Sequence, residues 1–369
     1  MRNIILFGVC MVASLCARSQ GCIAIRNLTG FGQFSLPQYD QEPVKWLFNA
    51  NTRYSEFHKT YDGSSEKTVP PEDQPFSSTF IMDLSVTRIL NNGWSISVDV
   101  PIMAGSRKTW QEHIGPSNKT KYTVHSYGLS DIRLTAYKWL FDIAKPHRGN
   151  IQLGLGVKLP TGDYRYQDYF HKSTTKVKLA PVNNTIQLGD GGTGITIELN
   201  SFLTVAKNLT LYANLFYLFS PRDHNGTSNT SGNDSTKVPY HPTIPSHYVY
   251  EAQGDVNSVP DAFTARAGAT YTIRSVSLWG GFRWEGSPVH DAIGQNNGQR
   301  RAGYAISFEP GINYNFKRTT IFAFVPIPLY RTTLQTVVDK RISKASGEYV
   351  SSPGGVADYL LFLGVMFRM

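Results

Sequence analysis

The chain has 369 residues, of which 17% are charged and 12% aromatic, with 20 Tyr, 20 Phe, 6 Trp and 32 Gly. Its mean hydropathy of −0.26 is too polar for a bundle of membrane-spanning helices, and no internal stretch supplies the ~18 uncharged apolar residues that such a helix needs. Ordinary globular domains carry roughly 25% charged residues. The composition therefore favours a transmembrane β-barrel, whose strands alternate apolar and polar residues.

The N-terminal residues predict a cleaved secretory signal peptide over 1–19. Arg2 is its basic start, residues 4–15 are its apolar run, and Ala17-Arg18-Ser19 is a small-x-small cleavage site. Cleavage removes two of the 36 basic residues, so 34 remain against 27 acidic ones, a net charge of +7. This excess is spread along the chain, and we therefore predict no nucleic-acid partner.

Residues 20–44 form an N-terminal leader that is apolar and rich in glycine. Two interpretations stay open: part of the leader folds into the barrel lumen as a plug, or it packs at the rim without fixed structure. Cys22 is the one cysteine that remains after cleavage, so it cannot form an intramolecular disulfide. It is either a buried thiol or, because it follows Gly21, a site of lipid attachment.

Twelve segments with period-2 alternation predict the strands of a barrel over residues 45–369. They cover 46–58, 79–90, 94–104, 130–141, 150–160, 195–205, 209–220, 262–273, 276–285, 304–316, 320–330 and 358–369. Short connections follow the even-numbered strands and long ones follow the odd-numbered strands, which is typical of outer-membrane barrels. The sequence thus predicts an all-β fold, a 12-stranded antiparallel up-and-down transmembrane β-barrel in the bacterial outer membrane. Both termini are expected on the periplasmic side.

Side-chain alternation assigns the two faces of most strands. In the segment 150–160, Ile151, Leu153 and Leu155 oppose Gln152 and Gly154. An Arg or Lys that faces lipid near mid-membrane costs about 2–4 kcal/mol, so the charged face must be the lumen. The strand over 320–330 is apolar on both faces and stays unassigned. The predicted lumen-lining residues are Asp83, Asp99, Asp131, Arg133, Lys158, Glu198, Arg266, Arg283, Glu285 and Glu309.

These lumen charges allow two interpretations. If they are paired, they form a salt-bridged network that props the wall or closes the pore; if some are unpaired, they set ion or solute selectivity. Aromatic residues cluster near the strand ends, where interfacial girdles are expected. They are Trp46, Tyr54, Trp94, Tyr137, Trp139, Tyr217, Trp284, Phe316 and Tyr359.

The last strand, DYLLFLGVMFRM, places Tyr359, Leu361, Leu363, Val365, Phe367 and Met369 on one face. It resembles the C-terminal strand that the bacterial barrel-insertion machinery recognises, which makes that machinery an expected partner. Such strands usually end in an aromatic residue, and Met369 departs from this pattern.

Residues 128–164 contain GLSDIRL and GVKLPTGDY. This pair of motifs resembles the outer-membrane barrels of the family named for the MetA-pathway of phenol degradation. The resemblance implies a barrel that passes small aromatic or other hydrophobic compounds. The family carries no agreed catalytic residues, so the resemblance assigns none here.

The sequence predicts no catalytic, cofactor or metal site. The run from Gly189 to Gly194 looks like a phosphate-binding loop, but it lacks the lysine and the strand–loop–helix context of a P-loop, and we expect a flexible extracellular loop. The nine histidines show no metal-ligand spacing. The enzyme alternative is a barrel hydrolase that uses His125-Ser126 or His290-Asp291.

The sequence favours a non-enzymatic channel or transporter for small hydrophobic or aromatic solutes, with outer-membrane lipid and the solute as its partners. The alternative is a barrel with a closed lumen and a structural or surface-binding role that uses its long loops. The loop over 221–260 is the strongest candidate for gating or binding. The sequence indicates no particular solute or oligomeric state.

Overall fold

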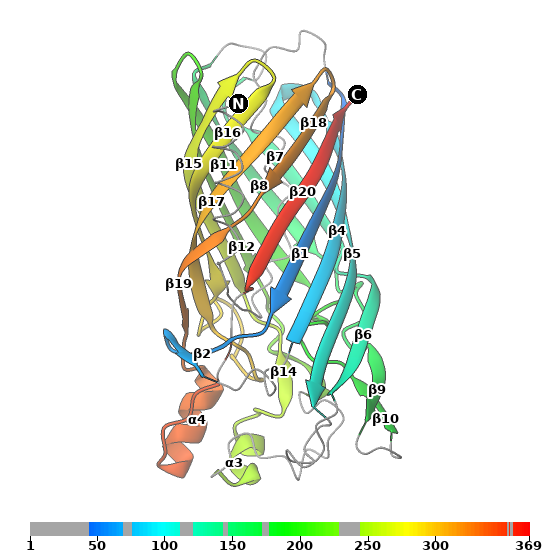
Figure 1. Ribbon diagram of the computed structural model, residues 1–369, viewed down its shortest axis with the longest axis vertical. Helices are drawn as coiled ribbons and strands as arrows, with labels where there is room; N and C mark the ends of the chain where they lie inside the picture. Colours follow the sequence, from blue (N-terminus) through cyan, green and yellow to red (C-terminus); the bar gives the residue numbers. More distant parts are fainter. Residues whose placement is uncertain are drawn as a thin grey trace, which may run out of the picture.

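Twelve antiparallel strand positions close into a barrel in the computed structural model (Figure 1). The structure describes residues 44–68, 76–110, 121–142, 147–171, 177–228, 244–352, 354 and 357–369. β1 pairs with β20 from Leu47↔Arg368 to Glu56↔Tyr359, and this pairing closes the sheet. The predicted 12-stranded antiparallel barrel is therefore confirmed. The barrel strands are β1 (Trp46–Phe57), β4 (Phe76–Ile89), β5 (Trp94–Trp110), β6 (Lys121–Leu129), β7 (Arg133–Trp139), β8 (Gly149–Lys158), β11 (Gly194–Ala206), β12 (Leu209–Phe219), β15 (Ala262–Ile273), β16 (Val276–Ser287), β17 (Gly303–Phe316), β18 (Thr319–Phe324), β19 (Ile327–Thr333) and β20 (Tyr359–Arg368).

The predicted signal peptide (1–19), almost all of the leader (20–43) and Cys22 lie outside the described residues. So does the middle of the long loop, residues 229–243. The predictions for these segments stay predictions.

Two of the twelve positions hold two strands each. β5 pairs with both β6 and β7 at the fourth position, and β17 pairs with both β18 and β19 at the eleventh. The predicted start of the fourth strand at residue 130 is wrong, because β6 already pairs with β5 from Lys121. This extension carries polar residues on both faces, so it shows no apolar alternation. At the eleventh position Pro326 separates β18 from β19; proline has no N–H to donate to a ladder.

The burial pattern of the wall is the reverse of that in a water-soluble protein: apolar side chains are exposed on the outer face, and polar side chains are buried inside the barrel. In β5 the apolar Trp94, Ile96 and Val98 are 47%, 49% and 37% exposed, whereas Ser95 and Asp99 between and beside them are only 5% exposed. β20 behaves alike: Leu361, Leu363, Val365 and Phe367 point outward, on the one face that the sequence predicts. A wide apolar outer surface around a polar interior is the arrangement of a barrel that faces lipid.

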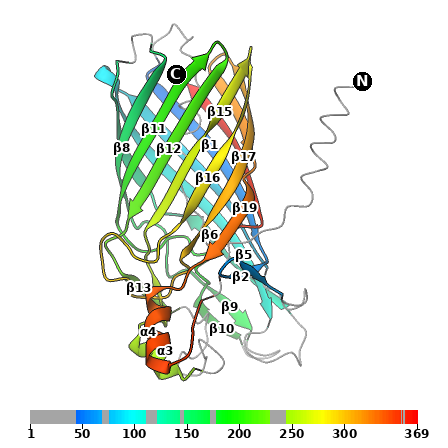
Figure 2. The same cartoon turned by 90° about the vertical axis from the view of Figure 1, so that its left-hand side faces the viewer.

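The two ends of the barrel differ. One end, the turn end, carries tight connections and the chain positions Lys45 and Met369, which are joined by a backbone hydrogen bond (top of Figure 1). Its Asn91–Gly93 turn requires positive φ at Asn92 (58°) and Gly93 (73°), as an Asn-Gly pair permits. The other end, the loop end, carries the long connections. They contain β2 (Thr60–Asp62), β3 (Ser65–Lys67), β9 (Gln167–His171), β10 (Val177–Pro181), β13 (His224–Ser228), α3 (Ser246–Glu251), β14 (Val256–Ser258) and α4 (Val337–Ser346) (Figure 2).

The two helices pack against each other at the loop end, in a small apolar cluster that includes Val249, Val338 and Ile342. The sequence prediction missed α4, although Thr336 and Asp339 form a capping box at its start. No described helix has both the length and the apolar character to cross a membrane.

The strand that the sequence left unassigned turns an aromatic face inward. Phe322 and Phe324 of β18 are 5% and 2% exposed and pack with Trp279 and Phe362 in one cluster inside the barrel. Glycine on the neighbouring strand makes room for a ring: a Cβ on Gly311 would lie 2.3 Å from Trp279. Aromatic rings therefore fill part of the lumen on this side of the barrel.

Candidate functional site

The inner wall carries the ten charged residues that the sequence places in the lumen. Nine of them are at most 8% exposed, and Asp83 is half-buried. Most of them lie in three clusters in which positive and negative side chains pair, brought together from different strands and connections. The clusters centre on Arg133, on Lys158 and on Glu309.

The first cluster joins β5, β7 and β11, of which β7 and β11 are separated by β8. Arg133 of β7 forms an ion pair with Asp99 of β5 at 2.9 Å and a second one with Glu198 of β11. Tyr137 donates a hydrogen bond from its hydroxyl to Glu198 at 3.1 Å. The prediction that Tyr137 belongs to an interfacial girdle is wrong: its ring is 2% exposed and lies inside, because it shares the inward face with Arg133.

The second buried cluster lies on β15, β16 and β17, and β12 separates β15 from the β11 of the first cluster. Glu309 of β17 binds both Arg266 of β15 and Arg283 of β16, the latter at 3.2 Å. Arg283 also makes a bidentate pair with Glu285, with both hydrogen bonds at 2.8 Å. Bidentate pairs combine geometric specificity with strong hydrogen bonds. This cluster therefore joins β15, β16 and β17 from inside the barrel.

The third cluster holds a segment that folds back into the barrel. We call residues 182–192 the inner loop; it follows β10 and leads into β11. Its Val182, Ile186 and Leu188 are at most 3% exposed and pack with Ile81 and Met103 of the wall. The expectation of a flexible extracellular loop over 189–194 is wrong in that this stretch packs against its neighbours, with Gly189, Gly191, Gly192 and Gly194 buried.

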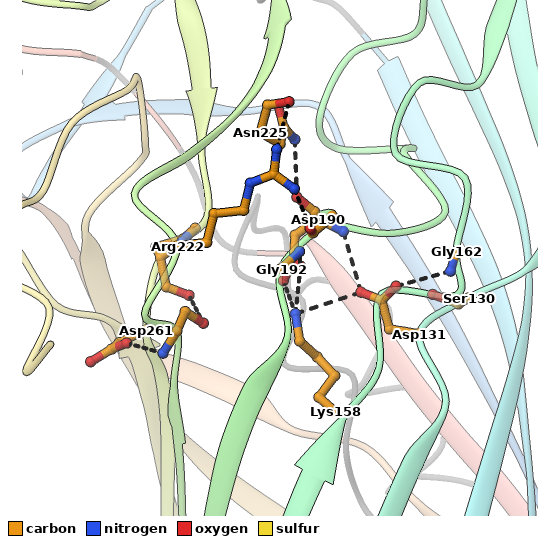
Figure 3. A network of polar contacts seen from close by, with 12 residues as sticks. Ser130, Asp131, Lys158, Gly162, Asp190, Gly192, Arg222, Asn225 and Asp261 are labelled. Carbon is orange, nitrogen blue, oxygen red and sulfur yellow. Dashed lines mark hydrogen bonds and ion pairs between the residues drawn. The ribbon is translucent and has the colours of Figure 1, made fainter. Parts of the chain in front are cut away.

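Polar contacts fix the inner loop to the wall (Figure 3). Asp131 accepts hydrogen bonds from the backbone N–H of Gly162 at 3.0 Å and of Asp190 at 3.2 Å, and lies 3.6 Å from the ammonium of Lys158. Lys158 forms a second ion pair with the Asp190 carboxylate. Ser130, next to Asp131, donates its hydroxyl to the carbonyl of Leu188. The break between β6 and β7 thus supplies the side chains that anchor the loop.

Segments of the loop end close over the inner loop. Arg222 donates to the carbonyl of Gly191 at 2.6 Å, and Asn225 donates to the carbonyl of Asp190 at 3.1 Å (Figure 3). Asp261 accepts hydrogen bonds from the N–H of Ser220 at 2.7 Å and of Ala292 at 2.8 Å. Burial raises the pKa of the Asp261 carboxyl above its ordinary value, although these donors act in the opposite direction.

A cavity of about 210 Å³ remains between the charged wall and these loops. Half of the predicted lumen residues border it: Asp83, Asp99, Asp131, Arg133 and Lys158. Glu198, Arg266, Arg283, Glu285 and Glu309 do not border it. The cavity is also lined by the apolar side chains of Phe216 and Leu218 and by polar groups of the loops, including Asn257, Arg300 and Arg301.

Several lumen residues escaped the sequence prediction. Arg53 of β1 and Arg368 of β20 are 3% and 5% exposed and face inward. Arg53 could have been found, because it alternates in register with Asn49, Asn51 and Ser55. Arg300 and Asn257 lie in long loops without periodicity, and no sequence signal places them at the cavity.

The residues of the proposed hydrolase do not form a nucleophile–base pair. Ser126 faces inward and donates its hydroxyl to the carbonyl of Ile186, whereas His125 faces outward with a 65% exposed side chain. Asp291 forms a bidentate ion pair with Arg300 at 2.5 and 2.6 Å. Within the described ranges, no group of three or more His, Cys, Asp or Glu is placed to hold a metal ion.

The barrel resembles solved outer-membrane proteins. It matches the COG4313 outer membrane channel from Pseudomonas putida F1 with a TM-score of 0.56 at 11% identity, over 90% of this chain and 98% of that one. A FadL homologue from Pseudomonas aeruginosa matches with a TM-score of 0.39 at 12% identity, over 88% and 90% of the two chains. The β domain of the Bordetella autotransporter Brka gives a TM-score of 0.44 at 8% identity, over 89% and 100%. No family model matches the chain, and no curated protein matches its sequence. At these identities the likeness shows the fold.

Proposed function

We propose that the protein is a non-enzymatic channel of the bacterial outer membrane, with its loop end outside the cell and its turn end in the periplasm. The apolar outer face and the contrast between tight turns and long loops support this placement. The similar fold of the COG4313 outer membrane channel supports it as well. A cleaved signal peptide over 1–19 and insertion by the barrel-insertion machinery belong to the same proposal.

We propose that the channel passes small solutes, hydrophobic or aromatic ones among them. The cavity of about 210 Å³ between the wall and the loops carries this proposal, because it provides room for a small molecule inside the barrel. Phe216 and Leu218 offer apolar contact there. The resemblance of residues 128–164 to the family named for the MetA-pathway of phenol degradation points to the same solutes, and it remains a resemblance because no family model matches.

Single-channel recording in planar bilayers tests the channel function, with liposome swelling as the test of solute class. We expect a small, defined conductance from the purified full-length protein, because the aromatic and ionic clusters narrow the lumen. Swelling should occur with hydrophobic or aromatic solutes that are small enough for the cavity. The absence of both conductance and swelling, from protein shown by heat-dependent electrophoretic mobility to be folded, would contradict the proposal.

A second candidate function follows from the pairing of the lumen charges. Arg133, Lys158 and Glu309 each bind two partners of opposite charge, and the loops fold over the cavity. A barrel closed in this way would serve a structural or surface-binding role through its loop end. The bilayer recording separates the two candidates, since a closed barrel conducts no ions.

A further inference from the structure

Two buried side chains at the cavity have no hydrogen-bond partner for any of their polar atoms. Thr196 of β11 is 1% exposed and its hydroxyl makes no hydrogen bond. Asn257 of β14 is 3% exposed, and neither its amide nitrogen nor its amide oxygen makes one. Both residues line the cavity of about 210 Å³. Because a buried polar group without a partner is costly, such groups in a cavity wall indicate a site for a polar ligand.

These two side chains come from different parts of the chain, and both backbones are held by hydrogen bonds. Thr196 sits within the wall, where it pairs with Gly156 of β8 and Leu218 of β12. Asn257 lies in a loop that is fixed by backbone hydrogen bonds on either side, from Ser258 to Gln299 at 2.9 Å and from Gln299 to Val256 at 2.7 Å. A ligand in the cavity would therefore meet preorganised donors and acceptors.

Six of the nine charged residues that line the cavity form ion pairs. Asp131 and Asp190 share Lys158, Asp99 binds Arg133, and Arg300 binds Asp291. Thr196 and Asn257, whose polar side-chain atoms all lack a partner, carry a hydroxyl and a carboxamide, which are uncharged and offer donors and acceptors together. The hydroxyl groups of a ligand also donate and accept hydrogen bonds, so they can pair with both side chains.

We propose that the cavity is a binding site for a small, uncharged ring solute that carries several hydroxyl groups, of about the size of a monosaccharide. Thr196 and Asn257 hydrogen-bond the hydroxyl groups, and Phe216 and Leu218 contact the apolar parts of the ring. This inference rests on the proposed channel function and adds a polyhydroxylated solute class to the hydrophobic and aromatic solutes proposed above.

Isothermal titration calorimetry tests the site directly, with glucose and myo-inositol as probes. The full-length protein is studied in a detergent without a sugar headgroup, so that the detergent does not compete. We expect saturable binding of at least one probe, and weaker binding of cyclohexanol, a ring with a single hydroxyl. Thr196→Val, which keeps the side-chain shape, and Asn257→Leu should each weaken the binding about fivefold, the loss of one hydrogen bond.

Thr264→Val is the matched control. The Thr264 hydroxyl is likewise buried without a partner, at 5% exposure, but Thr264 does not line the cavity. This variant should bind the probes as the parent protein does. If Asn257→Leu fails to fold, Thr196→Val still carries the test because its change is isosteric.

The outcomes separate this inference from the proposed function. Protein that conducts in bilayers but binds neither probe overturns the inference and leaves the channel intact. Protein that binds a probe with the expected loss in Thr196→Val but does not conduct supports the inference and overturns the channel function. An equal loss of binding in Thr264→Val and Thr196→Val overturns the inference, since the effect would then not come from the cavity.

Discussion

Lys158→Met tests whether ion pairs hold the inner loop in the lumen. The ammonium of Lys158 lies between Asp131 of the wall and Asp190 of the inner loop, and its side chain is only 10% exposed. Methionine keeps a long apolar stem and removes the charge. Two carboxylates would then face each other without their shared cation, and the loop would lose one of its main attachments.

The expected magnitude follows from the burial of the partners. Removing one member of a buried ion pair costs about 3–5 kcal/mol. The Asp190 side chain is 31% exposed, so water recovers part of this loss, and we expect about 2 kcal/mol. Every 1.4 kcal/mol is a factor of ten, so the population with the loop released should rise roughly thirtyfold. The backbone hydrogen bonds to Asp131 and the packing of Ile186 are unchanged, so the barrel itself should still fold.

Single-channel recording measures this population as the fraction of time spent in a state of larger conductance. Lys158→Met should increase that fraction, and adding Asp190→Asn should reverse part of the increase by removing one of the two facing charges. Lys178→Met, at an exposed site on β10 just before the inner loop, is the control and should behave like the parent protein. Identical records for Lys158→Met and Lys178→Met would refute the attachment of the loop through Lys158.

Three further predictions concern stability, measured as the temperature at which heat abolishes the electrophoretic mobility of the folded barrel. Glu309→Gln removes the carboxylate that bridges two buried arginines and should cost about 3–5 kcal/mol; an unchanged temperature would show that the bridge contributes nothing. Gly311→Ala places a Cβ 2.3 Å from the ring of Trp279 and should cost about 1–3 kcal/mol, whereas Gly280→Ala, whose Cβ meets its nearest neighbour at 3.3 Å, should cost less; the reverse order would contradict the packing argument. Asp261 has a raised pKa, so between its ordinary value of 3.8 and the raised value the folded state binds more protons and stability falls as pH rises; Asp261→Asn should remove this slope, and an equal slope in both proteins would contradict it.

The strands could be predicted because alternate residues face lipid and lumen, so that apolar and polar side chains must alternate along each strand. The segment 262–273 is an exact match to β15, and the final strand turns its predicted face outward. The two largest errors in strand bounds arose where this alternation is absent or interrupted. β5 and β6 extend beyond the region of alternation with polar residues on both faces, and proline divides the eleventh position into β18 and β19.

The placement of charges inward could also be reasoned from the sequence, but their partners could not. Arg133 joins Asp99 and Glu198, residues 34 and 65 positions away, and only the register of β5, β7, β8 and β11 brings them together. The inner loop shows the same limit. Its glycines indicate a loop. The contacts that hold it inside come from Asp131, between β6 and β7, and from Lys158 on β8, and the sequence of the loop does not show that these residues lie beside it.

The lumen divides into a part that supports the wall and a part that can recognise a solute. Around Glu309 every carboxylate binds an arginine, and the rings of Trp279 and Phe324 pack beside the cluster, with Arg266 over both rings at 5.9 and 5.5 Å. Charged groups that are paired in this way have little remaining capacity to hydrogen-bond a solute. At the cavity, Thr196 and Asn257 keep free donors and acceptors, and the nearby inner loop is held by contacts that a single charge change can weaken. Substitutions around Glu309 should therefore alter mainly the stability of the barrel, whereas substitutions at the cavity should alter mainly selectivity and conductance. Comparing the two sets of variants distinguishes residues that stabilise the barrel from residues that act in the proposed transport.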